Sequence, residues 1–259
     1  MKLKFLGTGG GRYVTGEQKR RTAGIIVETE ETKLHVDPGP GALVYANKEL
    51  ENPEEVEGLI VSHAHLDHAS DAEPIIEMIT EAYSNQAALF ANETALNGYG
   101  DIEKSVSNYH EGLCSRVEKL EEGSEYEYKD VKIASQEMFH GDPRTQGFTL
   151  ETEEKKIGFW TDTQYSEELL GLYKDCDVIV IYCTRPEGNS VKSHTAIGEV
   201  PEIMESTEAS TCIITHFGYS LLDSDLDEQK EYIEERIDGK VIFADDGMEF
   251  PGNKNLASF

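Results

Sequence analysis

The sequence predicts an α/β protein built in layers around at least one large β-sheet. Short apolar segments recur along its 259 residues with turns between them, and amphipathic stretches separate some of these segments. Strands that alternate with helices in one chain are typical of layered α/β architecture. No linker, internal repeat or low-complexity run divides the sequence. We therefore expect a single domain over residues 1–259, long enough to bury a substantial core.

The first third of the chain predicts strands followed by one helix. An apolar strand runs into Gly9-Gly10-Gly11, and the next two strands form a hairpin that turns through Glu30-Glu31. A short buried strand and an amphipathic helix follow the hairpin. In order, we expect strands at residues 2–7, 24–28, 33–36 and 58–61, and the helix at residues 74–83.

The rest of the chain predicts further strands separated by helices. The segment 85–125 has the weakest pattern, and there we expect one strand, at residues 88–91, and two helices. Apolar runs after this segment predict several more strands. They are expected at residues 131–138, 147–151, 157–161, 178–182, 212–215 and 240–244, with helices near 195–205 and 228–237.

The charge balance argues against two classes of partner. The chain carries 51 acidic and 23 basic side chains, which gives a formal net charge of −28. A protein that binds a phosphate backbone needs a basic surface, because its affinity comes mainly from released counterions. Most of this surface would repel a long nucleic acid or an anionic membrane. The acidity is typical of a protein that stays soluble in concentrated salt or a crowded cytoplasm.

The sequence predicts a cytoplasmic protein. The amino-terminal residues contain no apolar run of the length that a signal peptide needs, and no later stretch is long enough to span a bilayer. The cysteines are scattered, and their spacing does not indicate a disulfide framework. They are Cys114, Cys176, Cys183 and Cys212.

A dense group of metal-ligand side chains follows the strand expected at 58–61. Within Ser62-His63-Ala64-His65-Leu66-Asp67-His68, alternation places His63 and His65 on one side of an extended turn. Imidazole and carboxylate together suit zinc and similar ions. A merely solvated loop is the alternative, but chance clustering is a poor explanation because the whole chain has eight histidines.

Three more candidate ligands stand where a strand is expected to end. His140 follows Met138-Phe139, Asp162 follows Thr161, and His216 follows Thr215. Side chains at strand ends can converge on one edge of a sheet without burying a charge in its middle. Each residue alone has an ordinary structural alternative, but their occurrence together with the histidine cluster favours one shared metal site.

These residues, taken in order with Asp37 of His35-Val36-Asp37-Pro38-Gly39, resemble the five motifs of the metallo-β-lactamase superfamily. The resemblance extends over essentially the whole chain, and it implies a four-layer αββα sandwich with a dinuclear site at one edge. Two Zn²⁺ ions are the expected cofactors, with manganese or iron as alternatives. The implied ligands are His63, His65 and His140 for one metal, Asp67, His68 and His216 for the second, and Asp162 as the bridge, while Asp37 orients the site.

Two short motifs resemble the ribonuclease Z and phosphodiesterase branch of this superfamily. They are the opening Phe5-Leu6-Gly7-Thr8-Gly9-Gly10 and the stretch Ser193-His194-Thr195-Ala196. The resemblance implies that His194 protonates the leaving oxygen or steadies the scissile phosphate. An exposed capping role at a helix start is the alternative for His194.

Two departures from that branch argue against tRNA processing. Only a short connection joins His140 to Asp162, where the bacterial enzymes carry a long tRNA-gripping arm. Ile181-Tyr182-Cys183-Thr184 stands where the branch has a His-Glu-Ala-Thr motif, so the acidic partner of the catalytic histidine is missing. Together with the net charge, these departures predict a small substrate and make a large RNA unlikely.

A cluster of basic residues could receive a small anionic substrate. Arg12, Lys19, Arg20 and Arg21 follow the glycine run, and Arg144 follows His140. In the implied fold these loops rim the metal edge, so they could form a local positive patch. Surface pairing with the abundant glutamates is the alternative.

The sequence thus predicts a dinuclear metal-dependent hydrolase, with small phosphodiesters as the favoured substrates and Asp67 aiming the attacking hydroxide. Lactones, thioesters and β-lactams are the alternative substrates, because the same hydroxide attacks a carbonyl centre. A diiron oxidoreductase is a remoter alternative, since His65 is intact and no flavin domain is present. A non-catalytic scaffold is disfavoured by the full ligand set. Because relatives often dimerise, the resemblance allows a homodimer.

Overall fold

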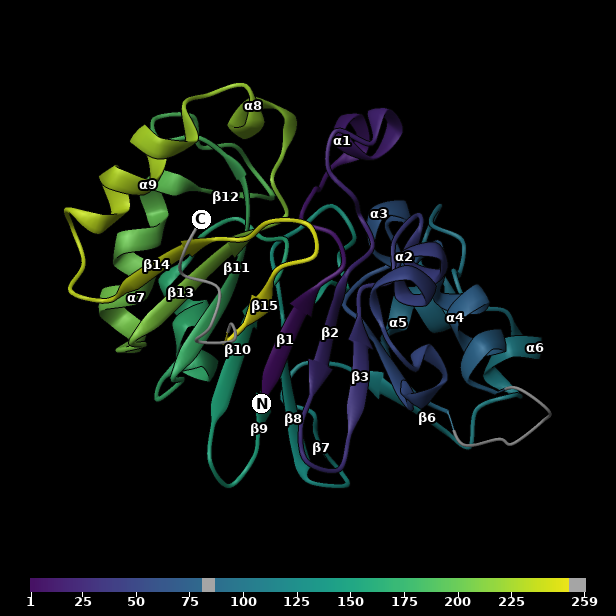
Figure 1. The fold of residues 1–259 in the computed structure, drawn as a ribbon. Helices are drawn as coiled ribbons and strands as arrows, with labels where there is room; N and C mark the ends of the chain where they lie inside the picture. Colours follow the sequence, from purple (N-terminus) through teal and green to yellow (C-terminus); the bar gives the residue numbers. More distant parts are fainter. Residues whose placement is uncertain (81–86, 252–259) are drawn as a thin grey trace.

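Two mixed β-sheets pack face to face in the computed structural model, which describes residues 1–80 and 87–251 (Figure 1). Helices cover the outer face of each sheet, so the layers run helix, sheet, sheet, helix. This order of layers confirms the α/β class and the αββα sandwich that the resemblance implies.

The first sheet comes mainly from the amino-terminal half of the chain. From edge to edge its strands are β15 (Glu249–Phe250), β1 (Lys2–Phe5), β2 (Ile25–Glu28), β3 (Lys33–Val36), β4 (Gly58–Val61), β5 (Ala88–Asn92) and β6 (Arg116–Leu120). The strands β2 and β3 form the predicted hairpin, with Ile25 opposite Val36. From β3 to β6 the neighbours run parallel, as expected for strands joined by helical crossovers.

The second sheet comes from the carboxy-terminal half. Its strands run β14 (Lys240–Phe243), β13 (Thr211–Thr215), β11 (Val178–Arg185), β10 (Lys156–Trp160), β9 (Gln146–Glu151), β8 (Val131–Glu137) and β7 (Glu125–Tyr128). A two-residue strand, β12 (Thr195–Ala196), pairs with the end of β11. The strands β7 to β10 are antiparallel, whereas β10, β11, β13 and β14 are parallel.

Strand β11 shows how the sequence builds two cores at once. Its residues alternate in direction, so Val180 and Tyr182 face the other sheet while Ile179 and Ile181 face the outer helices. Both faces are buried, which explains why the strand reads as a continuous apolar run. The chain therefore has one core between the sheets and a further core under each helical layer.

Helices of the first half cover the first sheet. They are α2 (Ala42–Glu49), α3 (Leu66–Ala69), α4 (Ala72–Ile79), α5 (Glu93–Asn97) and α6 (Asn108–Glu111), with a 3-10 turn η1 (Pro53–Glu55). In α4 the residues Ile75, Ile76 and Ile79 are spaced to form one buried face. This face packs into the same core as Leu59 and Val61 of β4.

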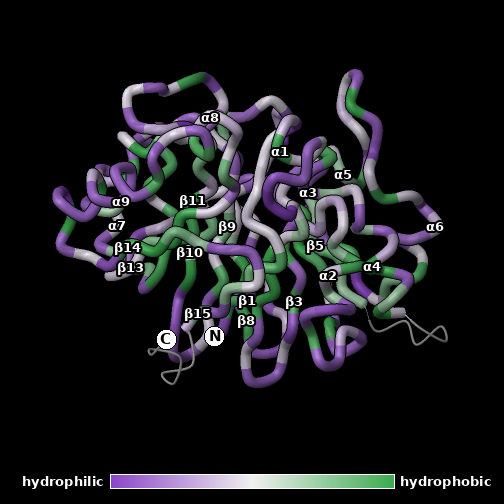
Figure 2. The backbone as a smooth tube through the Cα atoms, turned by 45° about the horizontal axis from the view of Figure 1, so that its top comes forward, coloured by the Kyte–Doolittle hydropathy of each residue, from purple (hydrophilic) through white to green (hydrophobic). Residues whose placement is uncertain are grey.

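The second sheet is covered by the 3-10 segments η3 (Glu167–Tyr173) and η4 (Ile197–Glu199) and by α7 (Val200–Thr207), α8 (Tyr219–Leu222) and α9 (Leu226–Glu234). Helix α1 (Arg12–Glu17) stands apart above the strand ends (Figure 1). Hydrophobic residues concentrate in the central strands, and hydrophilic residues follow the outer loops (Figure 2). Among the described residues no helix is both long and apolar enough to cross a membrane.

Several elements differ from the sequence predictions. The segment 85–125 holds the expected strand β5 and two short helices, but it also contributes β6 and the start of β7. Both of these strands lie at a sheet edge and carry alternating charged residues, a pattern that lacks the apolar signal of a central strand. Helices α1 and α2 were not predicted, and the last three residues expected in the 74–83 helix lie outside the described residues.

The helix expected at 195–205 begins later than predicted. Thr195 and Ala196 pair with β11, a 3-10 turn follows, and the α-helix starts at Val200. The prediction failed there because pairing with β11 uses the backbone before the helix. His194 therefore precedes a strand and does not cap a helix.

Candidate metal centre

The predicted ligands meet at one edge of the two sheets, where five strands end. Asp37 follows β3, His63 follows β4, and the remaining ligands of this edge follow β8, β10 and β13 as His140, Asp162 and His216. These strands point the same way, so their carboxyl ends bring side chains from distant parts of the sequence together. All of these residues are buried or nearly buried.

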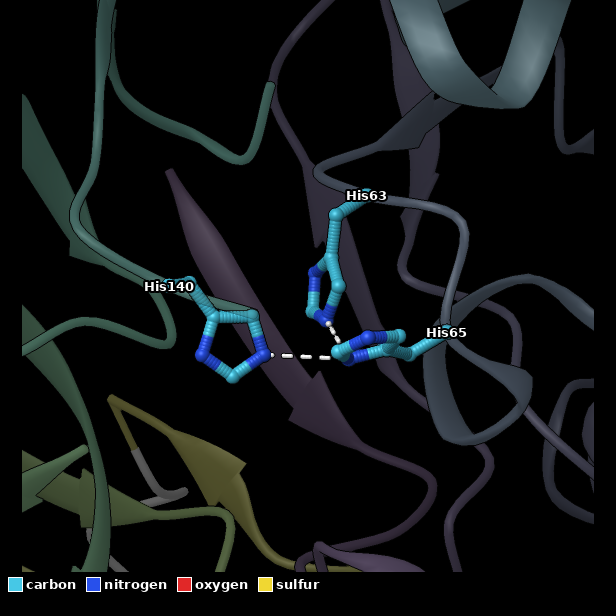
Figure 3. Close-up of side chains that lie close together, drawn as sticks. All are labelled: His63, His65 and His140. Carbon is cyan, nitrogen blue, oxygen red and sulfur yellow. Dashed lines mark hydrogen bonds between the residues drawn. The ribbon is translucent and has the colours of Figure 1, made fainter. Parts of the chain in front are cut away.

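Three imidazoles form what we call the histidine cage, made of His63, His65 and His140. His65 Nδ1 lies 3.0 Å from His63 Nε2 and 3.0 Å from His140 Nε2 (Figure 3). One tetrahedral zinc ion holds nitrogens at about 2.0–2.1 Å, which places two of them roughly 3.3 Å apart. The three nitrogens thus converge as ligands of one ion would.

A second group, the aspartate cage, consists of Asp67, His68 and His216. Asp67 Oδ2 lies 3.8 Å from His68 Nε2 and 3.7 Å from His216 Nε2. Asp162 lies between the two cages. Its Oδ2 atom is 3.2 Å from His216 Nε2 and 3.6 Å from His140 Nε2, so one carboxylate faces both groups.

Asp37 contacts the aspartate cage through His68. Its carboxylate accepts hydrogen bonds from the Ser62 amide at 2.8 Å and from the Tyr182 hydroxyl at 3.0 Å. It also lies 3.0 Å from His68 Nδ1, which leaves Nε2 of that ring facing Asp162. Burial raises the pKa of Tyr182 well above its usual range, so the phenol stays protonated and can donate. The contact with His68 is the one that the predicted orienting role of Asp37 requires.

The backbone at two of these positions is left-handed. Asp37 has φ 49° and His216 has φ 60°, values that non-glycine residues adopt at a cost of about 1–2 kcal/mol. Such strain is typical of sites where the surrounding structure holds a side chain in a required place. Gly10 is part of that surrounding structure, since a Cβ atom there would lie 2.2 Å from the His216 ring.

The protonation states suit metal ligands. Burial lowers the pKa of His63 well below its usual range and that of His140 to about 4, so both rings are neutral near pH 7. Burial alone would raise the pKa of Asp162, but His216 and His68 hold it well below its usual range. Burial opposes a charge on His68, yet three surrounding carboxylates raise its pKa well above normal. The carboxylates of Asp37, Asp67 and Asp162 thus concentrate negative charge around His68, and a bound cation would neutralise it.

Three orphaned atoms show that the pocket suits metal. His68 Nε2, His216 Nε2 and Asp162 Oδ1 are buried without a hydrogen-bond partner, although buried polar atoms are nearly always paired. The two nitrogens face Asp162 Oδ2 from the aspartate cage. Imidazole and carboxylate donors at this spacing can hold zinc, manganese or iron.

A model of the Beta-lactamase superfamily domain matches residues 32–217, which include every strand end that supplies a ligand. The chain belongs to this superfamily. The match covers well over half of the sequence and agrees with the fold and with the resemblance drawn from the motifs.

The chain is also similar to curated relatives and, in fold, to a solved structure. The uncharacterized protein MJ1374 of Methanocaldococcus jannaschii is 31% identical over 251 residues, covering 96% of this chain and 94% of that protein. A ribonuclease Z of Methanopyrus kandleri is 28% identical over 167 residues, covering 63% of this chain and 54% of the enzyme. The metallo-β-lactamase fold protein YhfI of Bacillus subtilis superposes with a TM-score of 0.78 at 16% identity, over 96% of this chain and 98% of that one.

The superfamily site opens into a cavity of about 850 Å³. Asp67, His140, Asp162 and His194 all line it, and the ring of His194 lies 5.0 Å from that of His140. The main chain beside His194 is tied to the site, because the Ser193 carbonyl lies 2.7 Å from His140 Nδ1. The predicted catalytic histidine is thus brought beside the metal ligands.

The four predicted substrate-binding arginines separate in the structure. Arg12 lines the cavity. Arg20 pairs with Asp245, Arg21 with Glu49, and Arg144 with Glu137, so these three side chains do not line this cavity. Their positions follow the alternative of surface pairing. Lys19 lies over the ring of Tyr219, which is itself a lining residue.

Two supporting features were missed in the sequence. The buried carboxylate of Asp142 accepts hydrogen bonds from the Ala64 amide at 3.1 Å and from Thr94 Oγ1 at 2.7 Å, and so anchors the turn that carries His63 and His65. Its position two residues after His140 was the available signal. The second feature is the Gly11 amide, which donates at 2.6 Å to Asp67 Oδ2.

Proposed function

We propose that the chain is a dinuclear metal-dependent hydrolase that acts on small phosphodiesters. One observation carries the proposal: Asp162 lies between the histidine cage and the aspartate cage, and both cages open into the same cavity. Two cages that share a carboxylate are the arrangement that a two-ion hydrolytic site requires.

The site residues divide into those that would hold metal ions and those that would act on water or substrate. His63, His65 and His140 would hold one zinc ion, Asp67, His68 and His216 a second, and Asp162 would reach both. When bound, such ions supply hydroxide near neutral pH and stabilise the negative charge that develops on the substrate. Asp67 faces the cavity, so it can also accept a proton from the attacking water and aim it.

His194 is placed to act on the leaving group of the substrate. One of its ring nitrogens lies within 4.8 Å of ligand atoms of His140 and Asp162, and the ring is only partly buried. From this position it can donate a proton to the leaving oxygen of a phosphodiester. Tyr182 stands where the motif of the ribonuclease Z branch has the acidic partner of this histidine, and its hydroxyl donates to Asp37.

A small substrate fits the chain better than a large RNA. The relative from Methanopyrus kandleri is a ribonuclease Z, and its name supports phosphodiester chemistry. In this chain, however, a short turn over residues 141–145 and the hairpin of β9 and β10 make up the connection from His140 to Asp162, which is too short for an RNA-gripping arm. The net charge of −28 would also repel a long polyanion.

Hydrolysis of carboxyl substrates is the second candidate. Pocket-lining side chains such as Leu66 and Tyr13 are apolar and exposed at the cavity, which would also suit a lactone or a thioester. The same hydroxide can attack either centre.

The test combines metal analysis with substrate comparison. We expect about two zinc or manganese ions per chain and faster turnover of bis(p-nitrophenyl) phosphate than of a chromogenic lactam or a thiolactone. Asp67→Ala should lose metal and turnover. Preference for the carbonyl substrates would favour the second candidate, and iron without hydrolysis would favour redox chemistry. Full activity of Asp67→Ala would refute the dinuclear site.

A further inference from the structure

The arginines of this acidic protein divide by what they contact. Five form ion pairs with a carboxylate, namely Arg20, Arg21, Arg116, Arg144 and Arg236. Within residues 1–80 and 87–251, neither Arg12 nor Arg185 has a carboxylate within 4.0 Å, although the chain carries 51 acidic side chains. These two are also the arginines that line the cavity.

Arg185 is held in place by the strand end beside it. It is the last residue of β11, and its Nη1 donates to Ser220 Oγ at 3.2 Å. Helix α8, which carries Ser220, sits close because Gly218 packs directly on Thr184, where a Cβ atom would lie 2.4 Å from the carbonyl oxygen. Arg185 Nε is buried without a hydrogen-bond partner in the described structure. The guanidinium is therefore positioned by the protein but left largely unpaired.

Arg12 lines the same cavity but belongs to the first half of the chain, between β1 and β2. It begins helix α1, directly after Gly11, whose amide donates to the metal-ligand residue Asp67. Arg185 instead belongs to the second sheet, three residues after Tyr182, which contacts Asp37. The two guanidinium groups thus border the metal centre from opposite halves of the fold.

We propose that Arg185 and Arg12 bind a second anionic group of the substrate, beside the one that is hydrolysed. The inference rests on the proposed function, because it assumes that the metal centre receives the scissile phosphate. A guanidinium binds a phosphate or carboxylate through paired N–H donors, and Arg185 keeps donors available. A cavity of about 850 Å³ has room for a substrate with more than one charged group. The substrate is then a small phosphodiester that carries a further phosphate or carboxylate.

Two matched esters test this subsite. One is the p-nitrophenyl ester of thymidine 5′-phosphate, and the other carries an additional phosphate at the 3′ oxygen. For the wild-type protein we expect kcat/KM to be about ten-fold higher with the second ester, as one charge-assisted contact would give. Arg185→Gln should abolish this preference through KM.

Further variants separate binding from folding. Arg185→Lys keeps the positive charge but loses the planar pair of N–H donors, so it should retain part of the preference. Ser220→Ala frees the guanidinium without removing it and should weaken the preference less than Arg185→Gln does. Arg236→Gln is the matched control and should keep the full preference, because Arg236 pairs with Glu235 and does not line the cavity. An ester with a carboxymethyl group in place of the 3′-phosphate shows which anion is preferred, and a gain with either supports the subsite.

The outcomes distinguish this inference from the proposed function. Equal kcat/KM for all three esters in the wild type, or an undiminished preference in Arg185→Gln, would overturn the subsite. If the wild type hydrolyses no ester, the proposed function fails, and binding decides the subsite alone. Isothermal titration would then compare thymidine 3′,5′-bisphosphate with thymidine 5′-phosphate. Tighter binding of the bisphosphate that disappears in Arg185→Gln supports the subsite, and an unchanged difference refutes it.

Discussion

The two halves of the molecule follow one plan but carry the site differently. Each sheet places antiparallel strands before parallel ones, and each is covered by helices on its outer face. The first half delivers its ligands in a single turn, from His63 to His68. The second half delivers one residue per strand end, at His140, Asp162 and His216.

This difference separates local from global information. The turn after β4 brings its ligands together with little help from the rest of the chain, apart from the Asp142 anchor and the Asp37 contact to His68. The ligands of the second half come together only when β8, β10 and β13 are in register. Substitutions in the two halves should therefore have different consequences for metal and for catalysis.

The largest expected effect follows from the shared ligand. Asp162→Ala removes the carboxylate that faces both cages, whereas His65→Ala weakens the histidine cage alone. Both variants should lose hydrolysis by at least about 1,000-fold, because the metal contribution is several kcal/mol. We expect Asp162→Ala to retain less metal than His65→Ala, as measured by mass spectrometry of the purified chain. Asp101→Ala, an exposed carboxylate, is the control, and equal metal loss in both ligand variants would contradict the sharing.

The same contrast between one local turn and several separate strand ends explains how much of the site could be predicted from the sequence. The His63–His68 turn was recognisable from spacing alone, and the strands that end at the site had clear apolar runs. His140, Asp162 and His216 were predicted from their places after expected strands and from their occurrence with the histidine cluster, and the family resemblance then divided them between two metals. Surface pairing was the stated alternative for Arg20, Arg21 and Arg144, but the individual partners could not be predicted, because Arg21 meets Glu49 and Arg20 meets Asp245 through tertiary contacts. Arg185 was missed for the same reason.

The second largest effect is expected at His194, the proposed proton donor, which lies in the second half of the chain. His194→Ala should lower kcat by about 100-fold or more for substrates with poor leaving groups, and much less for p-nitrophenolate, which needs no proton. The metal content should not change, because the cages are complete without His194. A series of aryl phosphodiesters with increasing leaving-group pKa gives the measurement. Equal losses across the series would exclude a proton-donor role.

A smaller effect should come from the contact that joins the halves at the site. Tyr182 of the second sheet donates to Asp37 of the first, and Asp37 orients His68. Tyr182→Phe removes this donor and should weaken metal binding by about 10- to 100-fold, the usual range for partners of metal ligands. Competition with a chelator measures the affinity. Tyr128→Phe, whose hydroxyl contacts only the Glu57 carbonyl at 3.4 Å, should not change it.

The smallest effect on activity is expected at a buried histidine that serves the first half alone. His35 is completely buried on β3, with Nε2 2.8 Å from the Ala23 carbonyl oxygen. Burial lowers its pKa from 6.5 to about 4, so the native state does not bind the proton that the unfolded chain binds below pH 6.5. Burying neutral His35 therefore costs no unfolding free energy above pH 6.5, and the unfolding free energy decreases as the pH falls from 6.5 toward 4.

His35→Gln keeps an N–H donor for Ala23 but removes this titration. Between pH 7 and pH 5 the wild type should lose about 2 kcal/mol more unfolding free energy than the variant, because the proton penalty acts on His35 alone. Urea unfolding of both chains at the two pH values measures the difference, and the many site carboxylates and imidazoles cancel in the comparison. Parallel pH dependences would show that His35 is not protonated on unfolding. Hydrolysis at pH 7 should be unchanged, since the ring faces away from the cavity into the contact with Ala23.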